Sequence, residues 1–342
     1  MSSLSVPHWR HATTPVGPRR AGQAGHRLAA PAAFLLALTY ATVLASLPLD
    51  AFNDRDNYLR YAAHSWAILK WYWSQGSVAL LANEPLWLVI NVSLSSVLSP
   101  EWTVRTVIFL PAFTVAWLVL RQDARHFIWL IVFLLMAQVI KNHIIHLRQG
   151  VAIAIFLCSW LSTRFRTRSL VMVIAAFVHG SFFFLLALYA IIHLARRMRL
   201  NPDIQFLIAA CAGVAVGLGV GFLASFLGAR QAAYYDFTLA DVSGLGFIFW
   251  AFILLIMLLE GTKYKKDYNY HISVVVFYLS TYFMLEVTAR IFESALIPIL
   301  LAGLSLSNWR RKVFLTMVCA YAVLQYHMRM QAPWLGWGIG AA

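Results

Sequence analysis

Apolar runs long enough to cross a bilayer follow one another along almost the whole chain. The first, from Leu28 to Leu47, has about 20 residues, the length that a helix needs to span the hydrocarbon core. Because 61% of the 342 residues are hydrophobic and 12% are charged, the chain has more apolar side chains than a soluble domain buries. The sequence therefore predicts an all-α polytopic membrane protein. The later runs are 78–98, 103–120, 127–140, 149–163, 169–194, 204–226, 244–260, 270–288, 290–306 and 313–330.

Short clusters of Lys and Arg between these runs orient the chain. If runs 78–98 and 169–194 each enter and leave the membrane on one side, every cluster and the basic N-terminal tail fall on the cytoplasmic side, where Lys and Arg prefer to stay. If every run spans once, the first two clusters fall outside, so we adopt the first topology. The net charge of +14 thus indicates membrane orientation and not nucleic-acid binding. The clusters are Arg121/Arg125, Arg164/Arg166/Arg168, Arg196/Arg197/Arg199, Lys263/Lys265/Lys266 and Arg310/Arg311/Lys312.

Each of these two runs contains a polar interruption, at Asn83-Glu84-Pro85 and at His179-Gly180-Ser181. Polar, non-helical backbone at membrane depth is tolerated only where it is buried in protein or lines a wet cavity. The breaks therefore predict a cavity, and the whole pattern predicts about 9–11 transmembrane helices with broken or re-entrant elements.

The rest of the chain divides simply. Residues 1–28 are predicted to be a disordered basic cytoplasmic tail, 29–330 a single polytopic membrane domain, and 331–342 a C-terminal tail. Residues 50–77 are predicted to lie outside as an amphipathic interfacial helix, because aromatic and apolar residues recur there near helical spacing. These residues are Tyr58, Tyr61, Trp66, Leu69 and Trp73.

The stretch KNHIIHLRQGVA (141–152) interrupts the apolar sequence most strongly. Arg148 and Gln149 open a span, where a guanidinium and free helix N–H groups suit a phosphate or diphosphate; the alternative is an Arg that only marks the interface. His143 and His146 share a helical face, but no nearby Cys or carboxylate completes a metal site. We expect them to contact headgroups or substrate, and no metal is predicted.

Several other polar residues have both a structural and a functional interpretation. Glu84 before Pro85 is either a helix cap or a carboxylate that acts as a base. His179 is either satisfied by helix carbonyls or serves as a base or hydrogen-bond donor beside Ser181. Arg290 lies at helical spacing from Glu286 and Glu293, which indicates either an intrahelical ion-pair cluster or a ligand site.

Asp54 and Asp56 form an Asp-x-Asp beside Tyr58, which is typical of a helix cap and also conceivable as a cation site for a nucleotide sugar. The chain has no Gly-rich phosphate loop, GxSxG elbow or zincin motif, so no ATP and no cofactor are expected.

Five stretches in order resemble the EpsG/Wzy-type family of bacterial polysaccharide polymerases, which make O-antigen, capsule or exopolysaccharide. They are NDRDNY (53–58), EPLW (84–87), LRQGVAIAIF (147–156), AAFVHGSFFFLL (175–186) and ARIFESALIP (289–298). The resemblance implies a GT-C-like glycosyltransferase in the bacterial inner membrane. Its N-terminus is expected in the cytoplasm and its active site on the periplasmic side. The implied substrates are undecaprenyl-diphosphate-linked oligosaccharides, and the candidate protein partners are a chain-length regulator or a flippase of the same pathway.

The chemistry that we hypothesise is inverting and metal-independent, because a sugar diphosphate already carries a good leaving group. The predicted catalytic residues are Glu84, His179, Asp54 and Asp56. The predicted substrate-binding residues are Arg148, Gln149, Arg290, Tyr58, His143, His146, Ser181 and Glu293. The competing interpretations are a flippase or transporter of lipid-linked oligosaccharide, an O-antigen ligase and a membrane acyltransferase.

Overall fold

The computed structural model describes residues 30–161, 165–226, 244–285 and 287–339, and these residues are helical, with one isolated bridge between Phe52 and Gly338. The predicted N-terminal tail lies outside the described residues. In chain order the elements are α1 Ala30–Ser46, α2 Arg55–Ser74, α3 Ser77–Ala82, α4 Pro85–Ser95, α5 Pro100–Leu120, η1 Ala124–His126, α6 Phe127–Leu134, α7 Ala137–Ile144, α8 Leu147–Trp160, α9 Phe165–Val178, α10 Ser181–Arg197, α11 Pro202–Phe226, α12 Leu245–Leu259, α13 Thr262–Asp267, α14 Asn269–Thr281, α15 Thr288–Glu293, α16 Leu296–Gly303, α17 Asn308–Arg329 and η3 Pro333–Gly336.

The apolar helices suit a membrane protein, but few of them are long. Of the described helices, α5 and the Pro202–Phe222 part of α11 are long and apolar enough to cross a bilayer alone. A third span is possible if Ala124–Leu134 and Ala137–Ile144, which meet at a 61° bend, are counted together. This is fewer than the 9–11 spans predicted, because breaks divide several apolar runs into shorter helices. The run 290–306, for example, becomes α15 and α16.

The two predicted break points are confirmed. Helix α3 ends at Ala82 and α4 begins at Pro85, while α9 ends at Val178 and α10 begins at Ser181. Proline at the first position suits the start of α4, because the N–H that it lacks has no partner within a helix there. The Asn83 side chain donates to the carbonyl of Ala79 at 2.7 Å, which satisfies the end of α3.

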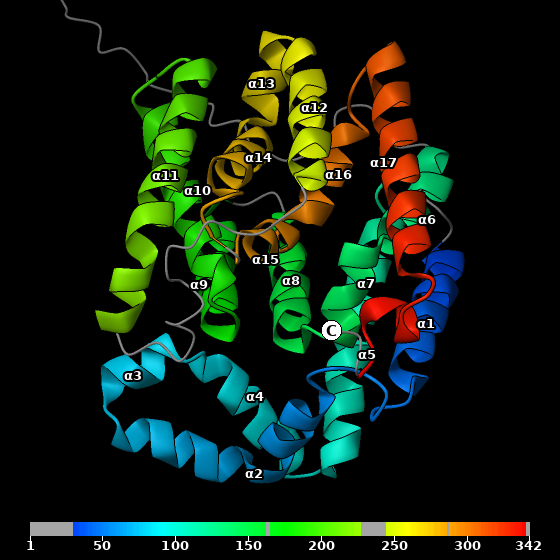
Figure 1. Cartoon of the computed structure of the whole chain (residues 1–342), viewed down its shortest axis with the longest axis vertical. Helices are drawn as coiled ribbons and strands as arrows, with labels where there is room; N and C mark the ends of the chain where they lie inside the picture. Colours follow the sequence, from blue (N-terminus) through cyan, green and yellow to red (C-terminus); the bar gives the residue numbers. More distant parts are fainter. Residues whose placement is uncertain (1–29, 162–164, 227–243, 286, 340–342) are drawn as a thin grey trace, which may run out of the picture.

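The helices stand as an upright bundle, and α2, α3 and α4 cross its lower end (Figure 1). Helices α9 and α10 form a hairpin whose turn points toward that end, as the proposed entry and exit on one side requires. Helix α2 carries exposed Trp66, Trp71 and Trp73, in keeping with an amphipathic helix. Its place at a membrane interface stays a prediction.

Basic clusters gather at the other end of the bundle. Arg125 and Arg311 line one cavity of about 350 Å³ there. Lys265 pairs with Asp203 at 2.8 Å, which joins α13 to the start of α11. Figure 1 shows α13 and the start of α17 at this upper end, away from α2–α4. The two ends therefore differ in charge as the topology predicts, and the assignment of each end to a membrane side stays a prediction.

The C-terminal segment, predicted as a tail, is packed against the first loop. Asn53 N donates to Trp337 O at 3.0 Å, and Ile339 N donates to Ala51 O at 3.1 Å. The Phe52 ring lies 5.0 Å from that of Trp334. These contacts hold the start of α2 in place.

Candidate active site

The break between α3 and α4 places a carboxylate inside the protein. Glu84 has φ +58°, a left-handed backbone conformation that costs a non-glycine residue about 1–3 kcal/mol. Its side chain is only 6% exposed. A strained backbone and a buried charge together mean that strong contacts hold Glu84 in this position.

Both oxygens of the Glu84 carboxylate accept hydrogen bonds. Nδ1 of His179 lies 2.9 Å from Oε1, and Gly180 N donates to the same oxygen at 3.3 Å. Nη1 of Arg148 donates to Oε2. The two interrupted runs therefore meet at one carboxylate, together with the first turn of α8.

Arg148 also interacts electrostatically with Tyr58 of α2. Tyr58 is buried, and its ring meets that of Trp87 edge-on at 5.8 Å. Burial raises the pKa of Tyr58, so the phenol stays protonated. Four of the sequence stretches that carry the family resemblance thus converge on this Tyr58–Arg148–Glu84–His179 cluster.

The start of α8 fits closely against α7 at Gly150. A Cβ at this position would overlap the carbonyl oxygen of Asn142 and lie 3.2 Å from Nδ1 of His143. Only glycine lets the two backbones approach this closely, and the approach sets the position of Arg148 two residues earlier.

We therefore predict that Gly150→Ala lowers the free energy of unfolding by about 1–3 kcal/mol, because the overlap forces α8 away from α7. Thermal denaturation of the purified protein in detergent measures the loss. The matched control is Gly219→Ala in α11, where nothing lies within 4 Å of the new Cβ. Equal melting temperatures for the two variants would contradict the prediction.

A buried hydrogen-bond chain connects α8, α15 and α10. Gln149 Nε2 donates to the carbonyl of Arg290 at 2.7 Å and to Ser294 Oγ at 3.1 Å. The hydroxyls of Ser294 and Ser181 are 2.8 Å apart. Gln149 and Ser181 were predicted to bind substrate; in the structure both are buried links that fix the backbone of Arg290 next to the cluster.

Arg290 is exposed, and among the described residues its guanidinium forms no ion pair. Of the two interpretations of Arg290, the intrahelical pair with Glu293 does not form, and Glu293 is bonded instead to Lys141 of α7 at 3.3 Å. Glu286 lies outside the described residues. With no ion pair to any described residue, the guanidinium of Arg290 is a candidate contact for a negatively charged ligand.

The two histidines of the central stretch have different surroundings. His143 is only 2% exposed, and its ring meets that of Tyr40 edge-on at 6.4 Å, so it packs in the core. Its contact with headgroups or substrate stays a prediction that this burial does not favour. His146 precedes α8 and lies within electrostatic reach of Lys141, Arg148 and Arg290. In the part of the chain that the structure describes, no three His, Cys, Asp or Glu residues gather as metal ligands do.

Asp54 and Asp56 lie at the exposed start of α2. Asp54 Oδ1 accepts a local hydrogen bond of 3.4 Å from the side-chain amide of Asn57. The structure does not bring either carboxylate into contact with Glu84 or His179. Their catalytic role stays a prediction that the geometry does not favour.

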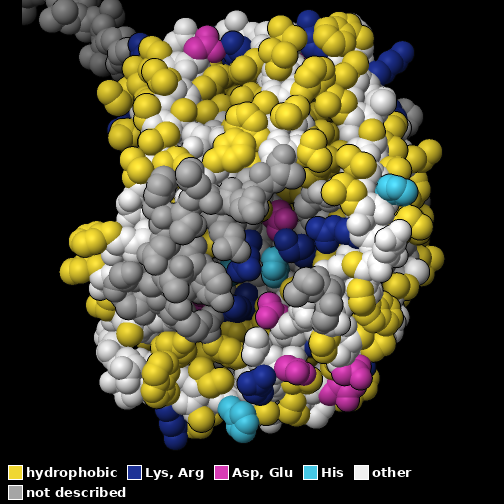
Figure 2. All heavy atoms as spheres, viewed as in Figure 1, with side chains coloured by type: hydrophobic (Ala, Val, Ile, Leu, Met, Phe, Trp, Pro, Cys, Tyr) yellow, Lys and Arg dark blue, Asp and Glu magenta, His cyan; other side chains and the backbone are white. Residues whose placement is uncertain are grey.

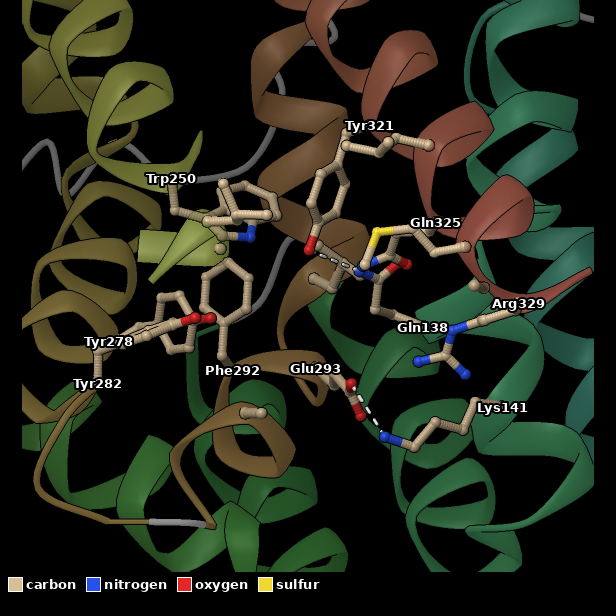
Figure 3. A pocket seen from close by; sticks show the side chains of 17 residues that line it. Gln138, Lys141, Trp250, Tyr278, Tyr282, Phe292, Glu293, Tyr321, Gln325 and Arg329 are labelled. Carbon is tan, nitrogen blue, oxygen red and sulfur yellow. Dashed lines mark hydrogen bonds and ion pairs between the residues drawn. The ribbon is translucent and has the colours of Figure 1, made fainter. Parts of the chain in front are cut away.

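A cavity of about 310 Å³ opens beside Lys141 and Glu293. We call it the aromatic cavity; it is lined by residues of α7, α12, α14, α15, α16 and α17. Figure 2 shows charged and His side chains gathered in the hollow at the centre of an otherwise largely hydrophobic face. In Figure 3, Trp250, Tyr278 and Phe292 lie on one side of the cavity, while Gln138, Gln325 and Arg329 lie on the other.

Sequence reasoning did not predict the residues on the polar side of the aromatic cavity, Gln138, Gln325 and Arg329. The one available signal was Gln325 and Arg329, one helical turn apart at the end of an apolar run. Gln138 donates to Tyr321, 183 residues later, a pairing that no local pattern indicates.

Comparison with known proteins gave one match. A sequence model described as the EpsG family matches residues 32–336. No curated protein and no solved structure matches the chain. The GT-C-like architecture therefore stays a prediction.

Proposed function

The chain belongs to the EpsG family, which is of the polysaccharide polymerase type, and we propose that it joins undecaprenyl-diphosphate-linked oligosaccharide repeat units into a polymer. The observation that carries the proposal is the contact of Glu84 with both His179 and Arg148. It combines a base for a hydroxyl with a cation for a diphosphate, the two groups that this glycosyl transfer needs.

His179 is the base in this proposal, and Glu84 positions it. A carboxylate bonded to Nδ1 holds the imidazole in one tautomer, directs Nε2 toward substrate and stabilises the imidazolium that forms. The acceptor is a sugar hydroxyl of one repeat unit. Because Glu84 already accepts three hydrogen bonds, it is better suited to orient His179 than to take the proton itself.

Arg290 and Arg148 stabilise the leaving diphosphate. Arg290 is exposed and forms no ion pair with any described residue. A guanidinium has five N–H donors, so Arg148 keeps donors beyond the one used by Glu84. Arginine matches phosphate oxygens in a bidentate geometry that lysine does not reproduce. Preorganised cations of this kind lower the barrier to phosphate departure.

The reaction is then a single displacement. The acceptor oxygen bonds to the anomeric carbon of the donor sugar, and the bond from that carbon to the diphosphate oxygen breaks. The hydroxyl proton passes to Nε2 of His179, and the bonding electrons leave with the polyprenyl diphosphate. Attack from the side opposite the leaving group inverts the configuration of the anomeric carbon.

The proposed location is the outer leaflet of the bacterial inner membrane. This is supported by the position of Glu84 at the start of α4, at the end of the bundle away from the basic clusters. Since Lys and Arg favour the cytoplasmic side, the cluster then faces the periplasm.

The test is reconstitution of the purified protein with the host's undecaprenyl-diphosphate-linked repeat unit, followed by gel separation of the lipid-linked products. The proposal expects a ladder of whole repeats. Movement of the substrate across the vesicle membrane with no ladder would contradict it and favour a flippase.

In the same assay Arg290→Ala is expected to reduce polymer by at least about 100-fold, in line with the loss of one transition-state donor. Expression and melting temperature should stay unchanged, because the side chain is exposed. The matched control is Arg311→Ala, which removes an arginine at the opposite end of the bundle. Arg329 does not serve as a control, because it lines the aromatic cavity. A polymer ladder from Arg290→Ala equal to that of wild type would contradict the role of Arg290 in diphosphate binding.

A further inference from the structure

The aromatic cavity contains buried acceptors that have no donor. Oε2 of Glu293, Oε1 of Gln138 and Oε1 of Gln325 are each buried and form no hydrogen bond within the described residues. All three residues line this one cavity. A buried polar atom without a partner costs about 1–3 kcal/mol, so three at one place call for an explanation.

The amide nitrogen of Gln138 is already engaged, because it donates to the Tyr321 hydroxyl at 3.2 Å. This bond fixes the Gln138 amide with its oxygen available to a ligand. Gln325 lines the same cavity. The unused acceptors therefore require a ligand that brings several O–H or N–H donors.

The opposite wall supplies aromatic surface. Tyr278 and Phe292 stack with ring centroids 4.1 Å apart, and Trp250 meets Phe292 edge-on at 4.5 Å. These contacts hold the rings rigidly, and all three side chains line the cavity (Figure 3). Rigid aromatic walls with a few placed polar groups are typical of small-ligand sites.

The cavity also supplies donors. Lys141 and Arg329 line it on the polar side, next to the two glutamines (Figure 3). A hydroxyl both donates and accepts, so a ligand rich in hydroxyls can satisfy the three oxygens and accept from these cations. The volume of about 310 Å³ is at the small end of ligand pockets and suits a short saccharide.

We propose that the aromatic cavity is a saccharide-binding subsite that holds hydroxyl-rich sugar residues of a repeat unit while the reaction proceeds at the Glu84–His179 cluster. The proposal rests on the proposed function for the identity of that saccharide. The two places are connected through α15: Glu293 lines the cavity, and the neighbouring Ser294 accepts a hydrogen bond from Gln149, which follows Arg148 in the chain. The subsite recognises the sugar by hydroxyl donors and ring stacking and does not require the lipid or the diphosphate.

The test is binding without reaction. The probe is the free oligosaccharide released by mild acid from the host's lipid-linked repeat unit, titrated by saturation-transfer NMR against the full chain in lipid nanodiscs. Wild type is expected to bind it. Gln325→Leu and Gln138→Leu each remove one acceptor and are expected to weaken binding about tenfold. Gln122→Leu, in the cavity at the opposite end, is the matched control and should bind as wild type does.

The outcomes separate this proposal from the proposed function. No binding to wild type, or equal Kd values for Gln325→Leu, Gln138→Leu and Gln122→Leu, would overturn the subsite even if polymer ladders are normal. The expected order of Kd values without any polymerisation would support the subsite and overturn the polymerase assignment. Gln325 is only partly buried, so its variant is expected to fold and gives a usable Kd.

Discussion

Arg148→Ala is expected to abolish polymer formation, with a loss of at least about 100-fold in the reconstituted assay. The variant removes a cation from the diphosphate and also leaves the buried carboxylate of Glu84 without its charged partner. Breaking a buried ion pair on one side costs about 3–5 kcal/mol, so a lower melting temperature is expected as well. Arg148→Lys should fail too, because an ammonium cannot bond both Glu84 and a phosphate in the geometry of the guanidinium.

Two further variants separate catalysis from folding. The double variant Arg148→Ala with Glu84→Gln has no uncompensated buried charge, so its melting temperature should recover toward that of wild type while polymer stays absent. Arg125→Ala removes an arginine that also pairs with a carboxylate, Asp123 at 2.8 Å, but at the opposite end; it should keep a normal ladder. A normal ladder from Arg148→Ala itself would refute its assignment.

His179→Asn is expected to lower the rate of polymerisation about 10²–10⁴-fold, the usual contribution of a general base. The asparagine amide can still donate to Oε1 of Glu84, so the hydrogen bond and the fold are expected to persist. Melting temperature and initial rate, measured on the same preparation, distinguish a lost base from a lost fold.

The chain provides a close control in His126, whose Nδ1 lies 3.2 Å from the carboxylate of Asp123 at the far end of the bundle. His126→Asn changes the same type of pair and should leave the rate unchanged. If His179→Asn is active while Glu84→Gln is not, Glu84 and not His179 takes the proton.

Local residue chemistry was enough to predict the helical membrane class, the two breaks and most of the polar cluster. Placing a polar or charged side chain among apolar ones costs free energy. Glu84, Arg148 and His179 were therefore recognisable as exceptions without knowledge of the tertiary structure. Proline and glycine at the breaks carry their own conformational preferences. The stretches that carried the family resemblance contain these residues, and the family was confirmed.

The roles of the residues were less predictable. Asp54 and Asp56 are exposed, His143 is buried against Tyr40, and Gln149 and Ser181 bond to Ser294. A polar side chain in an apolar run must find some partner, but whether that partner is the protein or a substrate depends on what packs beside it. The sequence alone leaves both possibilities open.

The sequence by itself determined that this is an apolar helical protein of the EpsG family with two broken elements, because the cost of polar groups in apolar surroundings is a property of each residue. Only the tertiary structure decided that Glu84 meets Arg148 and His179, which are 64 and 95 residues away, and that Gln138 meets Tyr321 in the aromatic cavity. Such contacts depend on how α4, α8 and α9 pack. The packing of similar apolar faces is set by their shape and by close approach, as at Gly150. Hydrophobic periodicity does not encode either of these.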